Sequence, residues 1–320
     1  MEYTDVKREM AARAAILYYQ HEKNQNEIAA QLGISRSYVS QLLTLARELG
    51  IVKITLSVDR SLEQEIYYTR ARGVSQAYVL PVEEENYPPQ ELGRFAAGHI
   101  TRLIRGAKNI GVNLGGSIRM AVENLTPGDF AGCEDKQVIQ MMGGYNKSEA
   151  GGQVLPGELA AALARVIGCR CRYINCPAIV GSSELQQLML KEPSIREVSD
   201  YWDTLDLALM GVGVIGESSR TMALLSPEER EKIEAGGAVC DINLNCFDGS
   251  GNYLPLLEDR RISASREQLK KIKTKVVVCA GRHKAAAAAA AIKSGMVDVL
   301  ITDAITAKAI CTALEEGGKA

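Results

Sequence analysis

Apolar residues recur every three or four positions through the first fifty residues, and this spacing predicts a group of short helices. From Tyr3 to Leu49 there is no proline, and the single glycine, Gly33, ends one helical stretch. Beyond residue 75 the pattern changes to short apolar runs that alternate with helical stretches. Runs that are apolar throughout are typical of strands covered on both faces. The larger part is therefore predicted to be a doubly wound, mostly parallel α/β domain.

We expect this organisation to divide the chain into three segments. Residues 1–58 form a winged helix-turn-helix domain in which Ile51–Val58 is the wing strand. Residues 59–75 form a linker with a charged helix at Ser61–Arg72, and residues 76–320 form the α/β domain. The strands expected there are Ala77–Leu80, Asn109–Asn113, Val138–Met142, Cys171–Asn175, Leu205–Met210, Ala238–Phe247, Val276–Cys279 and Val297–Thr302.

The stretch from Gln25 to Leu43 has the spacing of a helix-turn-helix. Ala29 is small enough for two helices to cross closely, and Gly33 follows four residues later, where the turn favours a positive φ. Ser35 is a suitable N-cap for the second helix. The alternative is an ordinary amphipathic helical hairpin, but the outward face of the second helix carries no acidic residue before Glu48.

A rotation of about 100° per residue places the apolar residues of the second helix on one side and small polar residues on the other. Such a face suits the major groove, where glutamine pairs with adenine and arginine with guanine or phosphate. We therefore expect double-stranded operator DNA as a partner. The predicted DNA-binding residues are Ser35, Arg36, Ser37, Tyr38, Ser40, Gln41 and Thr44.

Composition limits the other classes of function. The 320 residues include 37 Lys and Arg against 39 Asp and Glu, a net charge of −2, so a nucleic-acid surface must be local. The chain has no apolar run long enough for a membrane and no secretory signal, which indicates a cytoplasmic protein. The eight cysteines form no CxxC pair and the three histidines lie far apart. Reduced thiols, no metal site and no cofactor are expected.

Glycine-bearing loops follow several of the expected strands. They contain Gly116–Ser117, Gly143–Gly144, Gly281–Lys284 and Thr302–Asp303. Open α/β sheets bind ligands at the carboxyl ends of their strands, and helix N-termini favour anions. The loops together predict a pocket for an anionic ligand. Gly211–Gly216 also fits the G-x-G-x-x-G pattern of a nicotinamide-dependent dehydrogenase, but a strand end with close backbone contacts explains it better.

The ordered set of motifs resembles the SorC family of sugar-responsive transcriptional regulators, also called the sorbitol-operon regulator family. The resemblance covers nearly the whole chain. Besides the helix-turn-helix, it rests on Leu205–Gly213, Gly236–Asp241 with Phe247–Gly249, Ala280–Ala285, and Leu300–Asp303 with Thr306–Ala307. The resemblance implies an effector domain akin to sugar-phosphate isomerases and deaminases. It also implies a homo-oligomer, specifically a tetramer. The implied effector is a small anionic molecule, a phosphorylated sugar or polyol.

The resemblance also implies which residues bind the effector. They are Gly116, Ser117, Gly144, Gln153, Asp241, Lys284 and Thr302, with Lys147 and Arg282 as further candidates from the same loops. The chain departs from the family pattern where Arg282 and His283 follow Gly281 and where Cys240 replaces a glycine. No Schiff base is predicted at Lys147, because its position in the loop does not match that of the reactive lysine in some relatives.

The sequence thus favours a non-enzymatic, DNA-binding regulator of a carbohydrate-utilisation operon, controlled by a sugar or polyol. The alternative is a sugar-phosphate isomerase or deaminase that carries an accessory helical domain. Two features favour the regulator over the enzyme: the second helix is well suited to the DNA major groove, and no acid–base pair of catalytic side chains can be identified. No catalytic residue is expected.

Overall fold

The chain divides into two compact units, Met1–Val58 and Asp59–Ala320. The computed structural model describes residues 3–52, 62, 64, 65, 67, 68, 73–144, 156–216, 219 and 221–316, with side chains from residue 6 onward except at Pro156. Most of the expected wing strand lies outside these residues. Of the expected linker helix, the described positions Leu62, Gln64, Glu65, Tyr67 and Tyr68 are helical.

Three helices make up the described part of the first unit: α1 (Tyr3–Tyr19), α2 (Gln25–Leu32) and α3 (Arg36–Glu48). Their buried faces meet in one small core that includes Ala14, Ile28 and Leu42. The predicted helix-turn-helix is confirmed. Gly33 ends α2 with a φ of 64°, and the Ser35 hydroxyl accepts a hydrogen bond from the Tyr38 N–H at 3.1 Å to start α3.

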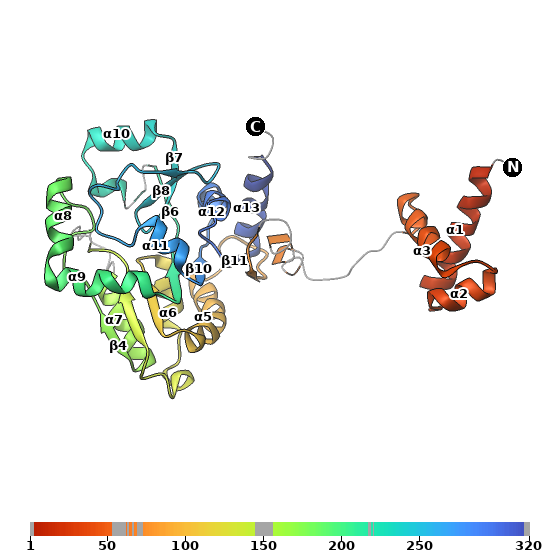
Figure 1. Cartoon of the computed structure of the whole chain (residues 1–320), viewed down its shortest axis with the longest axis horizontal. Coiled ribbons are helices and arrows are strands. Elements are labelled where there is room, and N and C mark those ends of the chain that lie inside the picture. Colours follow the sequence, from red (N-terminus) through yellow and green to blue (C-terminus); the bar gives the residue numbers. More distant parts are fainter. Residues whose placement is uncertain are drawn as a thin grey trace. The chain divides into compact units, whose positions relative to one another are not determined.

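A seven-stranded parallel sheet forms the centre of the larger unit, in the order β1-β11-β10-β5-β2-β3-β4 (Figure 1). Each pair of neighbouring strands runs parallel, as predicted. The strands are β1 (Gln76–Leu80), β2 (Asn109–Val112), β3 (Gln137–Gln140), β4 (Arg170–Arg172), β5 (Leu207–Met210), β10 (Thr274–Val278) and β11 (Val299–Asp303).

Helices cover both faces of this sheet, which explains why its central strands are rich in apolar residues. Along β10, Val276 and Val278 belong to one core while Val277 belongs to the other, since successive side chains alternate between faces. One face packs against α5 (Pro89–Gly106), α6 (Gly116–Glu123) and α7 (Pro156–Ile167). The other packs against α9 (Pro193–Ser199), α11 (Arg266–Lys271), α12 (Ala285–Lys293) and α13 (Ala304–Glu316).

The single strand expected at Ala238–Phe247 is wrong. The structure forms an antiparallel hairpin there, β7 (Ala238–Ile242) and β8 (Asn245–Asp248), in a second sheet of order β6-β7-β8-β9. β6 is Gly213–Val214 and β9 is Tyr253–Leu254. The turn between β7 and β8 places Asn243 and Leu244 at φ 54° and 63°. A turn with two positive φ values suits a two-residue hairpin, but a leucine at the second position gives little sequence signal for it.

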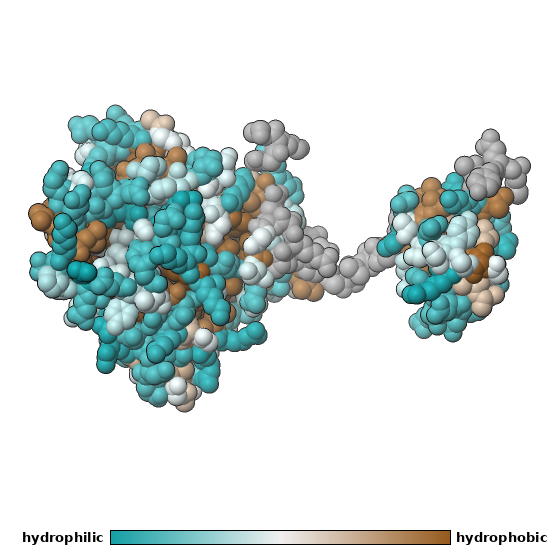
Figure 2. Space-filling model, in the orientation of Figure 1, coloured by the Kyte–Doolittle hydropathy of each residue, from teal (hydrophilic) through white to brown (hydrophobic). Residues whose placement is uncertain are grey.

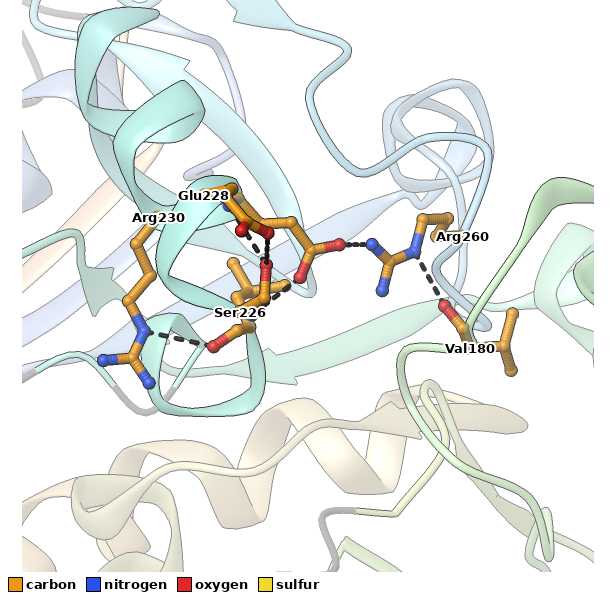
Figure 3. A network of polar contacts seen from close by, with 7 residues as sticks. Val180, Ser226, Glu228, Arg230 and Arg260 are labelled. Atoms are coloured by element: carbon orange, nitrogen blue, oxygen red, sulfur yellow. Dashed lines mark hydrogen bonds and ion pairs between the residues drawn. The ribbon is translucent and has the colours of Figure 1, made fainter.

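Contacts of α10 (Pro227–Ala235) tie this smaller sheet region to the rest of the unit (Figure 3). Ser226 caps the helix, and the Glu229 carboxylate accepts a hydrogen bond from the Ser226 N–H at 2.7 Å. Glu229 also pairs with Arg260, whose Nε donates to the Val180 carbonyl oxygen at 2.7 Å. Half-buried ion pairs with this geometry hold segments in register more firmly than exposed pairs do.

Hydrophilic residues cover most of the visible face of both units, and a hydrophobic patch lies over α8 (Ser183–Lys191) (Figure 2). None of the residues of α8 is buried. Leu185 and Leu188, one turn apart, are 40% and 66% exposed. Contiguous exposed apolar side chains of this kind mark contact surfaces in soluble proteins.

Close packing between α5 and α6 depends on Gly93. A Cβ atom there would lie 2.7 Å from the backbone oxygen of Met120. We expect Gly93→Ala to lower the free energy of unfolding by about 1–3 kcal/mol, because backbone must move to relieve the overlap. Gly98→Ala, in the same helix, has nothing within 4 Å and should instead raise it by about 0.5–1 kcal/mol. Urea unfolding of both variants measures this, and a Gly93 variant as stable as the Gly98 variant would contradict the packing.

Candidate functional site: a helix-turn-helix face and a cavity at the strand ends

The outward face of α3 carries most of the predicted DNA-binding side chains. Arg36, Ser37, Ser40, Gln41 and Thr44 are exposed, whereas Val39 and Leu42 are buried against the other helices. The remaining two predicted residues are differently placed. Ser35 is exposed and its hydroxyl caps the helix, while Tyr38 is half-buried against the small core.

α2 is fixed by a capping box that the sequence analysis did not use. The Asn24 side chain accepts hydrogen bonds from the backbone N–H groups of Asn26 and Glu27, at 3.0 and 3.1 Å. In return, the Glu27 carboxylate accepts from the Asn24 N–H at 2.8 Å. The N-x-x-E spacing was the available signal. The Glu27 carboxylate is therefore occupied at the start of its own helix.

A cavity of about 580 Å³ opens at the carboxyl ends of the central strands. Residues that follow β2, β3, β5, β10 and β11 line it, together with β6, β7 and the segment before α5. Its lining includes four predicted effector residues: Gly116, Ser117, Asp241 and Lys284. The structure therefore brings together residues that lie up to 168 positions apart in the sequence (284 − 116).

The first turn of α6 forms one side of this cavity. Gly115 precedes the helix in an extended conformation and provides no side-chain cap, so the N–H groups of Gly116 and Ser117 have no capping side chain. The loop after β5 approaches α6 closely at Gly211. A Cβ on Gly115 would lie 3.3 Å from the Gly211 Cα. Gly211 in turn donates its N–H to the Asn113 side chain at 3.0 Å. The close backbone contact expected for the glycines after β5 is confirmed.

Asp241 lies on β7 opposite Gly213 of β6. Its Oδ1 accepts a hydrogen bond from the Thr221 hydroxyl at 3.0 Å, and its Oδ2 accepts from the Leu244 N–H at 3.2 Å. A Cβ at position 213 would lie 2.1 Å from Oδ1, so only glycine leaves room for this carboxylate. Burial raises the pKa of Asp241, and the two hydrogen bonds oppose that shift.

Asp303, at the end of β11, was noted in the sequence only as the residue that heads the last helix. Its Oδ1 accepts from the N–H groups of Ile305 and Thr306, at 3.0 and 2.8 Å. Its Oδ2 accepts from the Thr306 hydroxyl at 2.6 Å and from the Tyr87 hydroxyl at 3.2 Å. Burial, and then the Asp303 charge, raises the pKa of Tyr87 above its ordinary value, so this phenol stays a donor.

Three predicted effector residues lie away from the described lining. Thr302 is fully buried in β11 beside Cys279, since it points to the face opposite Asp303. Gly144 uses its N–H and carbonyl to bind Cys176 and Ala178, at 2.8 and 2.9 Å. Arg282 is exposed and pairs with Glu85 at 3.2 Å, although Glu85 itself lines the cavity. Lys147 and Gln153 lie outside the described residues.

The charges around the cavity are mixed. Among its described lining residues, Lys284 supplies a full positive charge, while Glu85, Asp241 and Asp303 supply carboxylates. In the described parts of the chain, no group of three His, Cys, Asp or Glu side chains is placed to hold a metal ion. No described helix is both long and apolar enough to cross a membrane.

Comparison with known proteins gives a consistent assignment. A family model described as "Putative sugar-binding domain" matches residues 55–312, and one described as "Sigma-70, region 4" matches residues 15–48. The Deoxyribonucleoside regulator of Bacillus subtilis (strain 168) is 27% identical over 315 residues, covering 95% of this chain and 97% of its own. The Sorbitol operon regulator of Klebsiella pneumoniae is 26% identical, covering 93% and 96%.

Structural comparison agrees with these matches. The full-length sorbitol operon regulator SorC from Klebsiella pneumoniae has the same fold, with a TM-score of 0.74 at 23% identity, over 95% of this chain and 98% of that one. The sugar-binding model covers more than half of the chain. This chain belongs to the SorC family.

Membership of the SorC family makes the chain a DNA-binding transcriptional regulator whose larger unit is a sugar-binding domain of this family. The matched relatives are regulators and not enzymes, so the isomerase, deaminase and dehydrogenase alternatives fall away. The predicted family and fold are confirmed.

Burial of Asp241 predicts a pH dependence. Because its pKa is raised in the folded state, the folded protein holds this proton more tightly than the unfolded chain. The stability gained from the proton is present below the ordinary value of 3.8 and is lost as pH rises toward the raised value. Asn at 241 can accept from Leu244 and donate to Thr221 without titrating. Urea unfolding from about pH 4.5 to 7 should show the parent losing stability relative to Asp241→Asn. A difference that does not change with pH would contradict the raised pKa.

Proposed function

We propose that this SorC-family protein regulates a carbohydrate-utilisation operon in the cytoplasm, with a phosphorylated sugar or polyol as its effector. The observation that carries the proposal is the cavity itself. It sets an uncapped helix N-terminus and Lys284 in the same lining as the buried acceptor Asp241. Helix N–H groups and a lysine favour a phosphate, and a carboxylate accepts hydrogen bonds from sugar hydroxyls.

The effector residues we propose are those of the cavity wall: Gly116, Ser117, Asp241 and Lys284, joined by Thr221 and Asn243. Lys147 and Gln153 remain proposals from the family pattern alone. A ligand changes DNA binding only if it binds one arrangement of the protein better than another. The proposal therefore requires an effect on operator affinity and no conversion of the ligand.

We further propose that the protein works as a homo-oligomer, a tetramer as in the family resemblance. A single reading helix buries too little surface for operator-level specificity, so half-sites are bound by paired helices. The exposed leucines of α8 support a contact between copies. Glu184 and Lys191 flank Leu188 at four and three residues, so two antiparallel copies of α8 would pair opposite charges around that leucine.

The proposed DNA contact predicts a loss of specificity on the outward face of α3. Gln41→Ala should cost about 1–3 kcal/mol on a duplex selected by the protein from a random pool, and should relax base preference at one position. Gln76→Ala, an exposed glutamine of β1, is the matched control. Fluorescence anisotropy on selected and scrambled duplexes measures both. Equal affinities for the two variants would remove α3 from the interface.

The proposed effector site predicts that Lys284 controls the response to ligand. Lys284→Ala should weaken the effect of an active sugar phosphate roughly 10- to 100-fold, the value of a charge-assisted hydrogen bond. Operator affinity without ligand should stay the same. Lys308→Ala, an exposed lysine of α13 that does not line the cavity, is the control. A thermal-shift screen of sugars, polyols and their monophosphates identifies the ligand. A parental response in the Lys284 variant, or turnover of the ligand, would contradict the proposal.

A further inference from the structure

The linker (residues 59–75) contacts the α/β domain at the first turn of α13, and Glu65 Oε1 also accepts a hydrogen bond from the Val79 N–H of β1 at 2.8 Å. The Tyr68 side chain is fully buried, and its hydroxyl donates to the Ala307 carbonyl oxygen at 2.6 Å. Gln64 donates through Nε2 to the Ala304 carbonyl oxygen at 3.1 Å. Burial raises the pKa of Tyr68, so its phenol remains protonated and keeps this bond.

The same turn forms part of the cavity wall on its other side. Ile305 and Thr306 line the cavity, and so does Asp303, which caps the helix. In an α-helix, residues 304 and 307 lie about 60° apart, while 305 and 306 face the opposite side. A single helical turn therefore separates the linker from the cavity.

Four hydrogen bonds on the cavity side set the position of this turn. Tyr87 donates to Asp303 Oδ2 at 3.2 Å, and Asp303 Oδ1 accepts from the N–H groups of Ile305 and Thr306. The Thr306 hydroxyl accepts a hydrogen bond from the Gly281 N–H at 2.7 Å. Gly281 begins the loop that carries Lys284. A ligand that engages Lys284, Tyr87 or Asp303 thus acts on groups bonded directly to the first turn of α13.

We propose that the turn Ala304–Ala307 transmits occupancy of the cavity to the linker, with Tyr87 and Asp303 as the input and Gln64 and Tyr68 as the output. The inference rests on the proposed function, because it takes the cavity as the effector site. Packed turns shift as units between discrete arrangements, so a small displacement at the capping carboxylate moves both acceptor carbonyls together. The linker residues are positioning residues and touch no ligand.

Hydrogen exchange on the full chain tests the connection without any ligand. Tyr87→Phe removes one donor to Asp303 and keeps the ring. It should speed amide exchange at Gln64 and Tyr68 roughly two- to fivefold, because these two residues bind the turn that the substitution loosens. Tyr78→Phe is the matched control, since the Tyr78 hydroxyl bonds only to the exposed Gln76 side chain among the contacts described and does not line the cavity. Exchange in α7 serves as the internal reference.

The connection must also act in the reverse direction. Tyr68→Phe should speed exchange in residues 281–284 and 303–307, and the double variant should change exchange by less than the product of the two single changes. Unchanged exchange in the linker of Tyr87→Phe, or a rise equal to that in α7, would overturn the inference. A ligand screen without any binder would instead overturn the proposed function, so the two failures are distinguishable.

Discussion

The Asp303 carboxylate joins more parts of the effector domain than any other side chain described above. It ends β11, caps α13, binds Tyr87 from the segment before α5, and holds Thr306, which in turn binds the loop before α12. A buried carboxylate is stable only with such a full set of donors, since a missing partner leaves a charge without compensation. The cavity wall, the start of the last helix and the lysine-bearing loop therefore depend on one another.

This dependence follows from the direction of the sheet. Seven parallel strands place all their carboxyl ends at one edge, and residues that follow five of them line the cavity there. Most side chains of the central strands are apolar and pack against helices, so few polar groups of the sheet can reach a ligand. Those that do lie at strand ends, as Asp303 does at the end of β11, or in the residues that follow the strands. Glycines among these residues let backbones approach closely. Gly115 shows this, because a Cβ there would lie 3.3 Å from the Gly211 Cα, closer than an ordinary van der Waals contact.

The sequence was a good guide where local physics decides the outcome. The turn at Gly33, the cap at Ser35 and the seven parallel strands were all predictable from periodicity and turn chemistry. Prediction was weaker where a difference of one residue along a strand decides to which face of the sheet a side chain points. Thr302 was chosen over its neighbour Asp303, yet alternation along β11 buries the threonine and turns the carboxylate to the cavity. Gly144 bonds to the segment at Cys176 and Ala178, and Arg282 is exposed and reaches the cavity only through its ion pair with Glu85. Tyr87 and Thr221 gave no motif, because only tertiary contacts bring them to the cavity.

The charges of the cavity also limit what an effector can be. Three carboxylates and one lysine leave the described lining with more negative than positive charge, if all of them ionise. A ligand with several phosphates would place charge near these carboxylates at a large electrostatic cost in a partly buried site. A ligand with one anionic group and several hydroxyls suits this lining better. Its anionic group would pair with Lys284, and its hydroxyls would donate hydrogen bonds to Asp241. Because burial already raises the pKa of Asp241, hydrogen bonds from ligand hydroxyls would stabilise the ionised form and draw the pKa back down. The affinity of such a ligand would then depend on the protonation of Asp241, the carboxylate whose place opposite β6 requires a glycine at position 213.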